Sequence, residues 1–220
     1  MTQETLTLSI TAASIGFIHT LLGPDHYIPF VSLGKARNWS IWKTLTVTAL
    51  SGLGHVLSSV VLGFIGIAFG VMIFKLEAIE SMRGSIAAWS LIFFGMTYFA
   101  WGMYRILRGK GHSHCCAGGH SHEEDKKELT AWALFIIFVL GPCEPLIPLL
   151  IYPAAQNSMS SVIIVTLIFG VVTILTMMGA VLALSLGVSR LSLGPLTRYA
   201  HPLAGLIIAM SGIAVEFLGL

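Results

Sequence analysis

Two short segments place reactive side chains directly after a glycine-proline pair. "GPDHYIPF" carries Asp25 and His26, and "GPCEPLIPLL" carries Cys143 and Glu144. Proline lacks a backbone N–H and clashes with the preceding helical turn, so each pair is expected to interrupt a helix. Imidazole and carboxylate side chains are ligands that suit nickel, cobalt, zinc and iron, and a thiol adds a softer donor. Both breaks are therefore candidate metal-binding segments.

Two further histidines lie near the first segment or in the next apolar stretch. His19 precedes His26 by seven positions, which on an unbroken helix would put both side chains on one face. His55 lies in "GLGHVLSS", where small residues allow close helix approach. A single histidine in such a stretch is typical of packing, whereas three histidines with Asp25 favour a metal site. We expect the ligands His19, Asp25, His26, His55, Cys143 and Glu144.

A third group of candidates lies in the polar segment "RGKGHSHCCAGGHSHEEDKKE". Short tracts rich in histidine and cysteine bind transition metals, because several side chains converge on one ion. The spacing fits no closed zinc finger, so we expect a loop that collects or senses metal; a solvated linker is the alternative. The candidate ligands are His112, His114, Cys115, Cys116, His120 and His122.

The composition indicates an integral membrane protein. The 220 residues are 55% hydrophobic and only 10% charged, with a mean hydropathy of +0.87, whereas soluble domains carry about 25% charged residues. The net charge of +2 comes from basic residues scattered over loops, which gives no basis for nucleic-acid binding. The expected partners are a metal ion and the lipid bilayer, and a homo-oligomer is compatible with the sequence.

The apolar stretches predict six membrane-spanning helices, of which the first and fourth are broken. A span needs about 20 apolar residues. Ten of the twelve lysine and arginine residues fall after the first, third and fifth spans, which by the positive-inside rule puts that side in the cytoplasm. The protein is thus expected in the cell membrane, with both termini outside and the His-rich loop cytoplasmic. The expected spans are residues 5–34, 42–74, 85–107, 129–155, 159–188 and 198–220.

The two glycine-proline segments also indicate an internal repeat. They lie 118 residues apart, and the same offset places His55 over Thr173. Three spans per half would give the halves opposite orientations, the plan of many secondary transporters that bind substrate at broken helices near the membrane midplane. We therefore predict an all-α fold of two inverted three-helix repeats, residues 1–107 and 129–220, joined by the loop 108–128.

Charged side chains inside a membrane are costly, and they usually serve a function. A purely structural alternative is that Asp25 and Glu144 cap the helices that follow the breaks. A third class of function, a membrane scaffold without transport, predicts that these polar residues tolerate apolar substitution.

"HTLLGPDHYIPF" resembles the His-x-x-x-x-Asp-His signature of the nickel/cobalt transporter superfamily, although five residues separate His19 from Asp25 here. "GLGHVLSSVVLGF" is similar to the second-span histidine segment of its six-span efflux members and of its urease- and hydrogenase-associated permeases, and those efflux members also carry a His-rich loop. The resemblance implies that Asp25, His26 and His55 are metal ligands, with His19 beside them. It favours nickel or cobalt, and zinc or iron also suit the ligands.

"GPCEPLIPLL" differs from the commoner second-half sequence of that superfamily and resembles the Pro-Cys-x-x-Pro segments of transmembrane thiol-disulfide electron carriers. That chemistry needs two cysteines within disulfide range, so Cys143 would have to pair with Cys115 or Cys116. The main prediction is a transporter of a divalent transition metal, not an enzyme, that works by alternating access. It contains no Walker-type nucleotide-binding motif, so a gradient or a partner would drive it. The alternative prediction is an electron carrier that uses Cys143.

Overall fold

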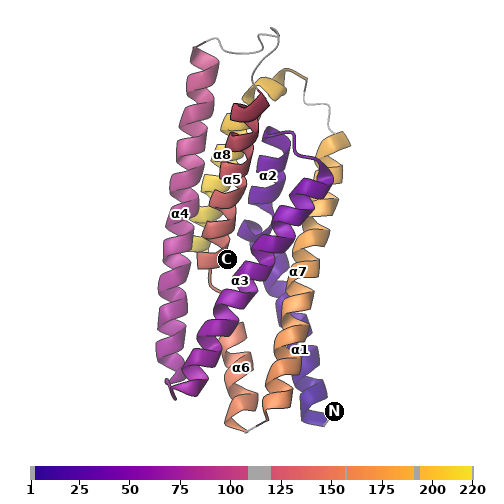
Figure 1. The fold of residues 1–220 in the computed structure, drawn as a ribbon, viewed down its shortest axis with the longest axis vertical. Helices are drawn as coiled ribbons and strands as arrows, with labels where there is room; N and C mark the ends of the chain where they lie inside the picture. Colours follow the sequence, from indigo (N-terminus) through magenta and orange to yellow (C-terminus); the bar gives the residue numbers. More distant parts are fainter. Residues whose placement is uncertain (1–2, 109–119, 157, 191–193, 220) are drawn as a thin grey trace.

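In the computed structural model, residues 3–108, 120–156, 158–190 and 194–219 are described, and their regular elements are all helical. The helices run along the long axis of the molecule (Figure 1). Two short 3-10 helices, η1 and η2, precede α2 and α8. The elements are α1 (Gln3–Leu22), η1 (Pro24–His26), α2 (Ile28–Ala36), α3 (Ile41–Ala68), α4 (Ile73–Leu107), α5 (His120–Leu140), α6 (Leu146–Ala155), α7 (Met159–Arg190), η2 (Gly194–Tyr199) and α8 (Ala200–Leu218).

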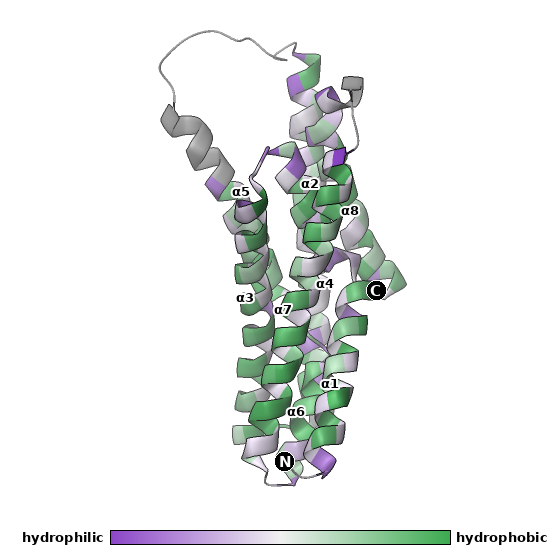
Figure 2. Ribbon diagram, turned by 90° about the vertical axis from the view of Figure 1, so that its right-hand side faces the viewer, coloured by the Kyte–Doolittle hydropathy of each residue, from purple (hydrophilic) through white to green (hydrophobic). Residues whose placement is uncertain are grey.

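Five of these described helices are long and apolar enough to cross a membrane: α1, α3, α4, α7 and α8. Hydrophobic residues make up most of the length of the helices, and hydrophilic residues are most frequent toward the two ends (Figure 2). Large apolar side chains such as Phe93 and Leu175 are exposed, which suits a surface that faces lipid. The protein is therefore a multi-pass membrane protein. The arrangement of six spans as two inverted repeats stays a prediction.

Both predicted helix breaks are present. The first separates α1 from α2 at residues 23–27, and the second separates α5 from α6 at residues 141–145. The expected fourth span is accordingly two shorter apolar helices. In Figure 1, α2 and α5 occupy the upper half of the molecule and α1 and α6 the lower half, so both breaks lie toward the middle of the long axis.

The third predicted span began too late. We expected it at residue 85, but α4 begins at Ile73 and continues for 35 residues. The charged residues Lys75, Glu77, Glu80 and Arg83 made this stretch resemble a loop. In the structure Lys75 and Glu77 are exposed, whereas Glu80 is buried and pairs with Arg83, so the helix accommodates all four.

Two hydrophobic clusters form the core. The first includes Phe30, Phe138 and Met177, and the second includes Leu146 and Phe169. Met177 thus packs in the core, on Gly52 of α3.

Glycine allows α4 and α8 to approach closely. A Cβ atom added at Gly205 would lie 2.4 Å from the Phe99 backbone nitrogen, and one at Gly95 would lie 2.4 Å from the Ala209 backbone nitrogen. Small residues at such crossings bring helix backbones together, the usual basis of packing between helices in lipid. The α4–α8 pair is thus a backbone-to-backbone contact.

Candidate functional site

Three histidines from separate elements converge beside the first break. One ring nitrogen from each of His19 (α1), His26 (η1) and His55 (α3) lies within 4.8 Å of the others. The centroid of the His26 ring is 5.0 Å from that of His19 and 5.2 Å from that of His55. The helix break makes this possible, because it carries His26 across from the α1 face to a position between the other two rings.

His26 is held by its neighbour Asp25. The Nδ1–H of His26 donates to Asp25 Oδ1 over 3.0 Å, and the His26 side chain is only 4% exposed. Gly23 makes room for this arrangement, because a Cβ atom there would lie 2.4 Å from His26 Nδ1. Asp25 therefore supports the imidazole, and the group of converging ligand atoms does not include its carboxylate.

His55 is held by a backbone carbonyl. Its Nδ1 lies 3.3 Å from the Phe138 oxygen, near the end of α5. Because a carbonyl only accepts hydrogen bonds, Nδ1 carries the proton, and in the neutral ring Nε2 keeps its lone pair. A metal-binding imidazole typically donates its other N–H to a carboxylate or a carbonyl in this way. In His26 this partner is the Asp25 carboxylate, and in His55 it is the Phe138 carbonyl.

The Nε2 atoms of all three histidines are buried and have no hydrogen-bond partner in the described chain. Leaving a buried polar atom unsatisfied costs about 1–3 kcal/mol. A single cation would satisfy all three lone pairs. Ligand nitrogens at about 2.0–2.1 Å from one tetrahedral ion lie about 3.3 Å apart, so nitrogens that are up to 4.8 Å apart would have to approach one another by up to about 1.5 Å. The residues thus fit a divalent transition metal.

A small cavity of about 30 Å³ lies beside His55. Its lining includes Asp25, His55, Gly84, Gly141 and Pro142. This volume holds about one water molecule. Residues of both helix breaks and of α4 thus line one small cavity beside His55.

The second break places its two candidate ligands elsewhere. Cys143 is fully buried, and its backbone N–H donates to Ser59 Oγ and Glu80 Oε2 over 3.1 and 3.0 Å. Glu144 is exposed. Neither residue belongs to the group of converging ligand atoms. Of the expected six-residue site, the structure brings together the three histidines, with Asp25 as the hydrogen-bond partner of His26.

Sequence reasoning missed two residues beside the second break, Glu80 and Arg83. Arg83 falls between the predicted spans 42–74 and 85–107, but it lies in α4 and pairs with Glu80, which is 0% exposed. The sequence signal that could have identified them is a pair of opposite charges three residues apart in an apolar stretch. Their partners lie in α3, earlier in the chain, and at the second break, about 60 residues later, so only the folded packing identifies them.

The candidate ligands of the polar loop cannot be compared with the structure. His112, His114, Cys115 and Cys116 lie outside the described residues. α5 begins at His120, and the description of its side chains does not extend to His120 and His122.

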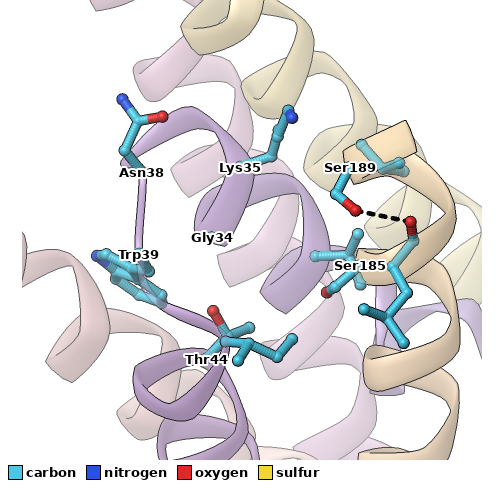
Figure 3. A pocket seen from close by; sticks show the side chains of 11 residues that line it. Gly34, Lys35, Asn38, Trp39, Thr44, Ser185 and Ser189 are labelled. Atoms are coloured by element: carbon cyan, nitrogen blue, oxygen red, sulfur yellow. Dashed lines mark hydrogen bonds between the residues drawn. The ribbon is translucent and has the colours of Figure 1, made fainter. Parts of the chain in front are cut away.

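A larger pocket lies between the end of α2, the start of α3 and the end of α7. Its volume is about 470 Å³, and its polar lining includes Lys35, Asn38, Thr44, Ser185 and Ser189 (Figure 3). In Figure 3 the hydroxyl of Ser189 bonds within α7, to the Leu186 carbonyl over 2.7 Å. The lining contains no histidine, cysteine or carboxylate, so this pocket resembles a hydrated recess more than a metal site.

Comparison with known families places most of the chain in one of them. Residues 28–214 match the family described as "Cytochrome C biogenesis protein transmembrane region". The chain belongs to this family. The match to the cytochrome C biogenesis family includes His55, Cys143 and both residues of the Glu80–Arg83 pair, and it begins just after His26. No curated protein and no solved structure matches the chain.

Membership of the cytochrome C biogenesis family supports the resemblance of "GPCEPLIPLL" to transmembrane thiol-disulfide carriers. It does not extend to the nickel/cobalt transporter superfamily, so that assignment is not shown. Family and fold agree that the chain is a multi-pass membrane protein.

Proposed function

We propose that this protein carries a divalent transition-metal cation across the membrane and binds it through His19, His26 and His55. The observation that carries the proposal is a group of three histidines, one ring nitrogen of each lying within 4.8 Å of the others. Their buried Nε2 atoms have no hydrogen-bond partner among the described residues. Neutral imidazoles suit nickel, cobalt and zinc. The resemblance of the histidine segments favours nickel or cobalt as the substrate.

The chemistry of binding follows from the supports of the histidines. Asp25 and the Phe138 carbonyl fix the Nδ1 protons of His26 and His55, so their Nε2 lone pairs are free for the ion. Binding requires deprotonated ligands, so protons compete with the metal, and affinity should fall as the pH falls. The negative charge of Asp25 would partly balance the cation in a site of low dielectric constant.

Transport requires that the site open alternately to the two sides. Broken helices provide hinges beside the site, and this is the arrangement of many secondary transporters. The pocket at the end of α2 is a suitable recess on the side that the basic residues assign to the cytoplasm. In the proposed cycle, the first hydrophobic cluster, which includes Phe30 and Met177, would have to part to connect this recess with the histidines.

The second candidate function is transfer of reducing equivalents through Cys143, and the family match supports it more directly than it supports metal transport. Cys143 lies at the break in the segment that resembles thiol-disulfide carriers. Disulfide exchange needs a second cysteine within about 7 Å between Cα atoms. Among the described residues Cys143 is the one cysteine, and it is a free thiol. The second thiol would have to be Cys115, Cys116 or one from a partner protein.

One experiment separates the two candidates. The purified protein is reconstituted in liposomes that contain a dye quenched by Co²⁺, and Co²⁺ is added outside. Metal transport predicts rapid quenching that His26→Ala reduces at least tenfold, while Cys143→Ser and the control His201→Ala retain it. His201 is a suitable control because it bonds to Tyr98, outside the three-histidine group.

In parallel liposomes, a dithiol reductant is trapped inside and a disulfide substrate is added outside. Electron transfer predicts reduction of that substrate, and Cys143→Ser abolishes it. Absence of quenching by the wild-type protein, for Co²⁺ and also for Ni²⁺ and Zn²⁺ with suitable dyes, would rule out the metal proposal.

A further inference from the structure

Two charged residues of α4 are buried beside the second helix break. Glu80 is 0% exposed, and the side chain of Arg83, with which it forms an ion pair, is 17% exposed. Charged groups within a membrane protein are expensive and usually have a specific role. Neither residue belongs to the three-histidine group.

Arg83 binds the carbonyl end of α5. Its Nη2 donates to the Val139 oxygen over 3.0 Å and to the Gly141 oxygen over 3.2 Å. The last carbonyls of a helix have no partner within the helix, and lipid cannot supply one. Arg83 therefore satisfies the backbone groups that the break leaves free on its upstream side.

Glu80 binds the opposite side of the same break. Its Oε2 accepts the backbone N–H of Cys143 over 3.0 Å and the hydroxyl of Ser59 over 3.1 Å. The ion pair thus holds the ends of the interrupted backbone at a fixed separation. We call Glu80 and Arg83 together the clamp.

The clamp is connected to His55 in two ways. The Phe138 carbonyl, which accepts from His55 Nδ1, directly precedes the Val139 carbonyl that Arg83 binds. Ser58 and Ser59, one turn after His55 on α3, bond to Arg83 and Glu80 over 2.7 and 3.1 Å. Movement of the clamped backbone would therefore displace the group that orients the His55 ring.

We infer that Glu80 and Arg83 are positioning residues for the three-histidine site: by fixing the α5–α6 break, they keep the Phe138 carbonyl where it aims His55 Nε2 at the other two histidines. The inference rests on the proposed function, because it assigns the clamp to the metal site. In this inference the second break contributes to metal binding by positioning the Phe138 carbonyl, and neither Cys143 nor Glu144 has to be a ligand.

The test measures Co²⁺ binding to the purified full-length protein by titration calorimetry and by the visible spectrum of bound cobalt. Glu80→Gln and Arg83→Gln should weaken binding about 10- to 100-fold, the usual effect of removing the support of a ligand. Arg83→Lys keeps the charge but loses the planar fork of donors, so it should restore binding only in part. The matched controls are Glu77→Gln and Lys75→Gln, exposed residues of the same helix, which should bind as the wild type does.

A second readout does not depend on metal. In a Cys115→Ser/Cys116→Ser background, the buried Cys143 thiol should react slowly with a maleimide, and loss of the clamp should accelerate the reaction at least tenfold. The double variant Glu80→Gln/Arg83→Gln leaves no unpaired buried charge, so it distinguishes loss of positioning from loss of folding. It should fold, as judged by circular dichroism and gel filtration, and still bind Co²⁺ weakly.

The outcomes are distinguishable. If the wild type binds Co²⁺ and the clamp variants bind it equally well, the inference is wrong and the proposed function stands. If the wild type binds none of Co²⁺, Ni²⁺ and Zn²⁺, the proposed function is wrong. The role of the clamp in fixing the second break is then tested by the maleimide reaction of Cys143 alone. An unchanged rate of that reaction in the variants would show that this role is wrong as well.

Discussion

At the scale of single residues, the chemistry of the site depends on the division of roles between Asp25 and the three histidines. Asp25 is adjacent to His26 in sequence and bonds to its ring over 3.0 Å. The carboxylate therefore acts on the basicity and orientation of His26. This resembles the carboxylate–histidine–metal arrangement of many metal sites, in which the outer partner is nearly as important as the ligand.

Replacement of Asp25 tests this role. Asp25→Asn retains an oxygen that accepts from His26 Nδ1 but removes the negative charge, so Co²⁺ affinity should fall about 10- to 100-fold while the protein still folds. His26→Ala removes a ligand and should reduce affinity more. Titration calorimetry on the two purified variants measures the difference. Equal losses in both would indicate that Asp25 is itself a ligand.

At the scale of elements, the two helix breaks differ in what stabilises them: residues of the break itself in the first, and residues of another helix in the second. The first break depends on Gly23, which leaves space for the His26 ring. The second depends on Glu80 and Arg83, which come from another helix. Glycine-proline pairs are visible in the sequence, so both breaks were predictable. The partners that satisfy the freed backbone groups were not, because they depend on how α4 packs.

A glycine substitution in the first break should affect the site before it affects the fold. In Gly23→Ala the new methyl group would lie 2.4 Å from His26 Nδ1 and 2.9 Å from Cε1, so the ring must move. We expect at least a tenfold loss of Co²⁺ affinity. The control is Gly179→Ala in α7, where a Cβ atom meets nothing within 4 Å. The control should bind normally and be slightly more stable, because alanine favours helix. Normal Co²⁺ binding by Gly23→Ala would contradict the role given to this glycine.

At the scale of the whole molecule, hydropathy predicted the class and most helix positions. Residues 159–188 correspond closely to α7, because long apolar stretches have few alternatives in lipid. Residues 42–74 cover α3 but extend six residues past its end at Ala68, into the start of α4. Charge made the start of α4 hard to predict. The pattern of histidines brought His19, His26 and His55 into one hypothesis, and the structure brings their rings together. The sequence did not predict that Cys143 packs against α3 and α4, apart from the histidines, because this location depends on how the chain folds.

The orientation of the molecule gives a prediction of its own. Basic residues concentrate after α2, α4 and α7, so the segment between α4 and α5 should face the cytoplasm. In a Cys143→Ser variant, a membrane-impermeant maleimide should label Cys115 and Cys116 in inverted vesicles at least tenfold faster than in right-side-out vesicles. The reverse preference would invert the assigned topology.

The length of α4 has a consequence for the surrounding lipid. At 1.5 Å per residue its 35 residues extend about 52 Å, against about 30 Å for the hydrocarbon layer of a bilayer. Even a tilt of about 40° shortens its reach along the membrane normal only to about 40 Å, so its ends must emerge among the headgroups. Bilayer thickness therefore bears directly on this helix through hydrophobic mismatch, and acyl-chain length becomes a means of perturbing the protein without changing a residue.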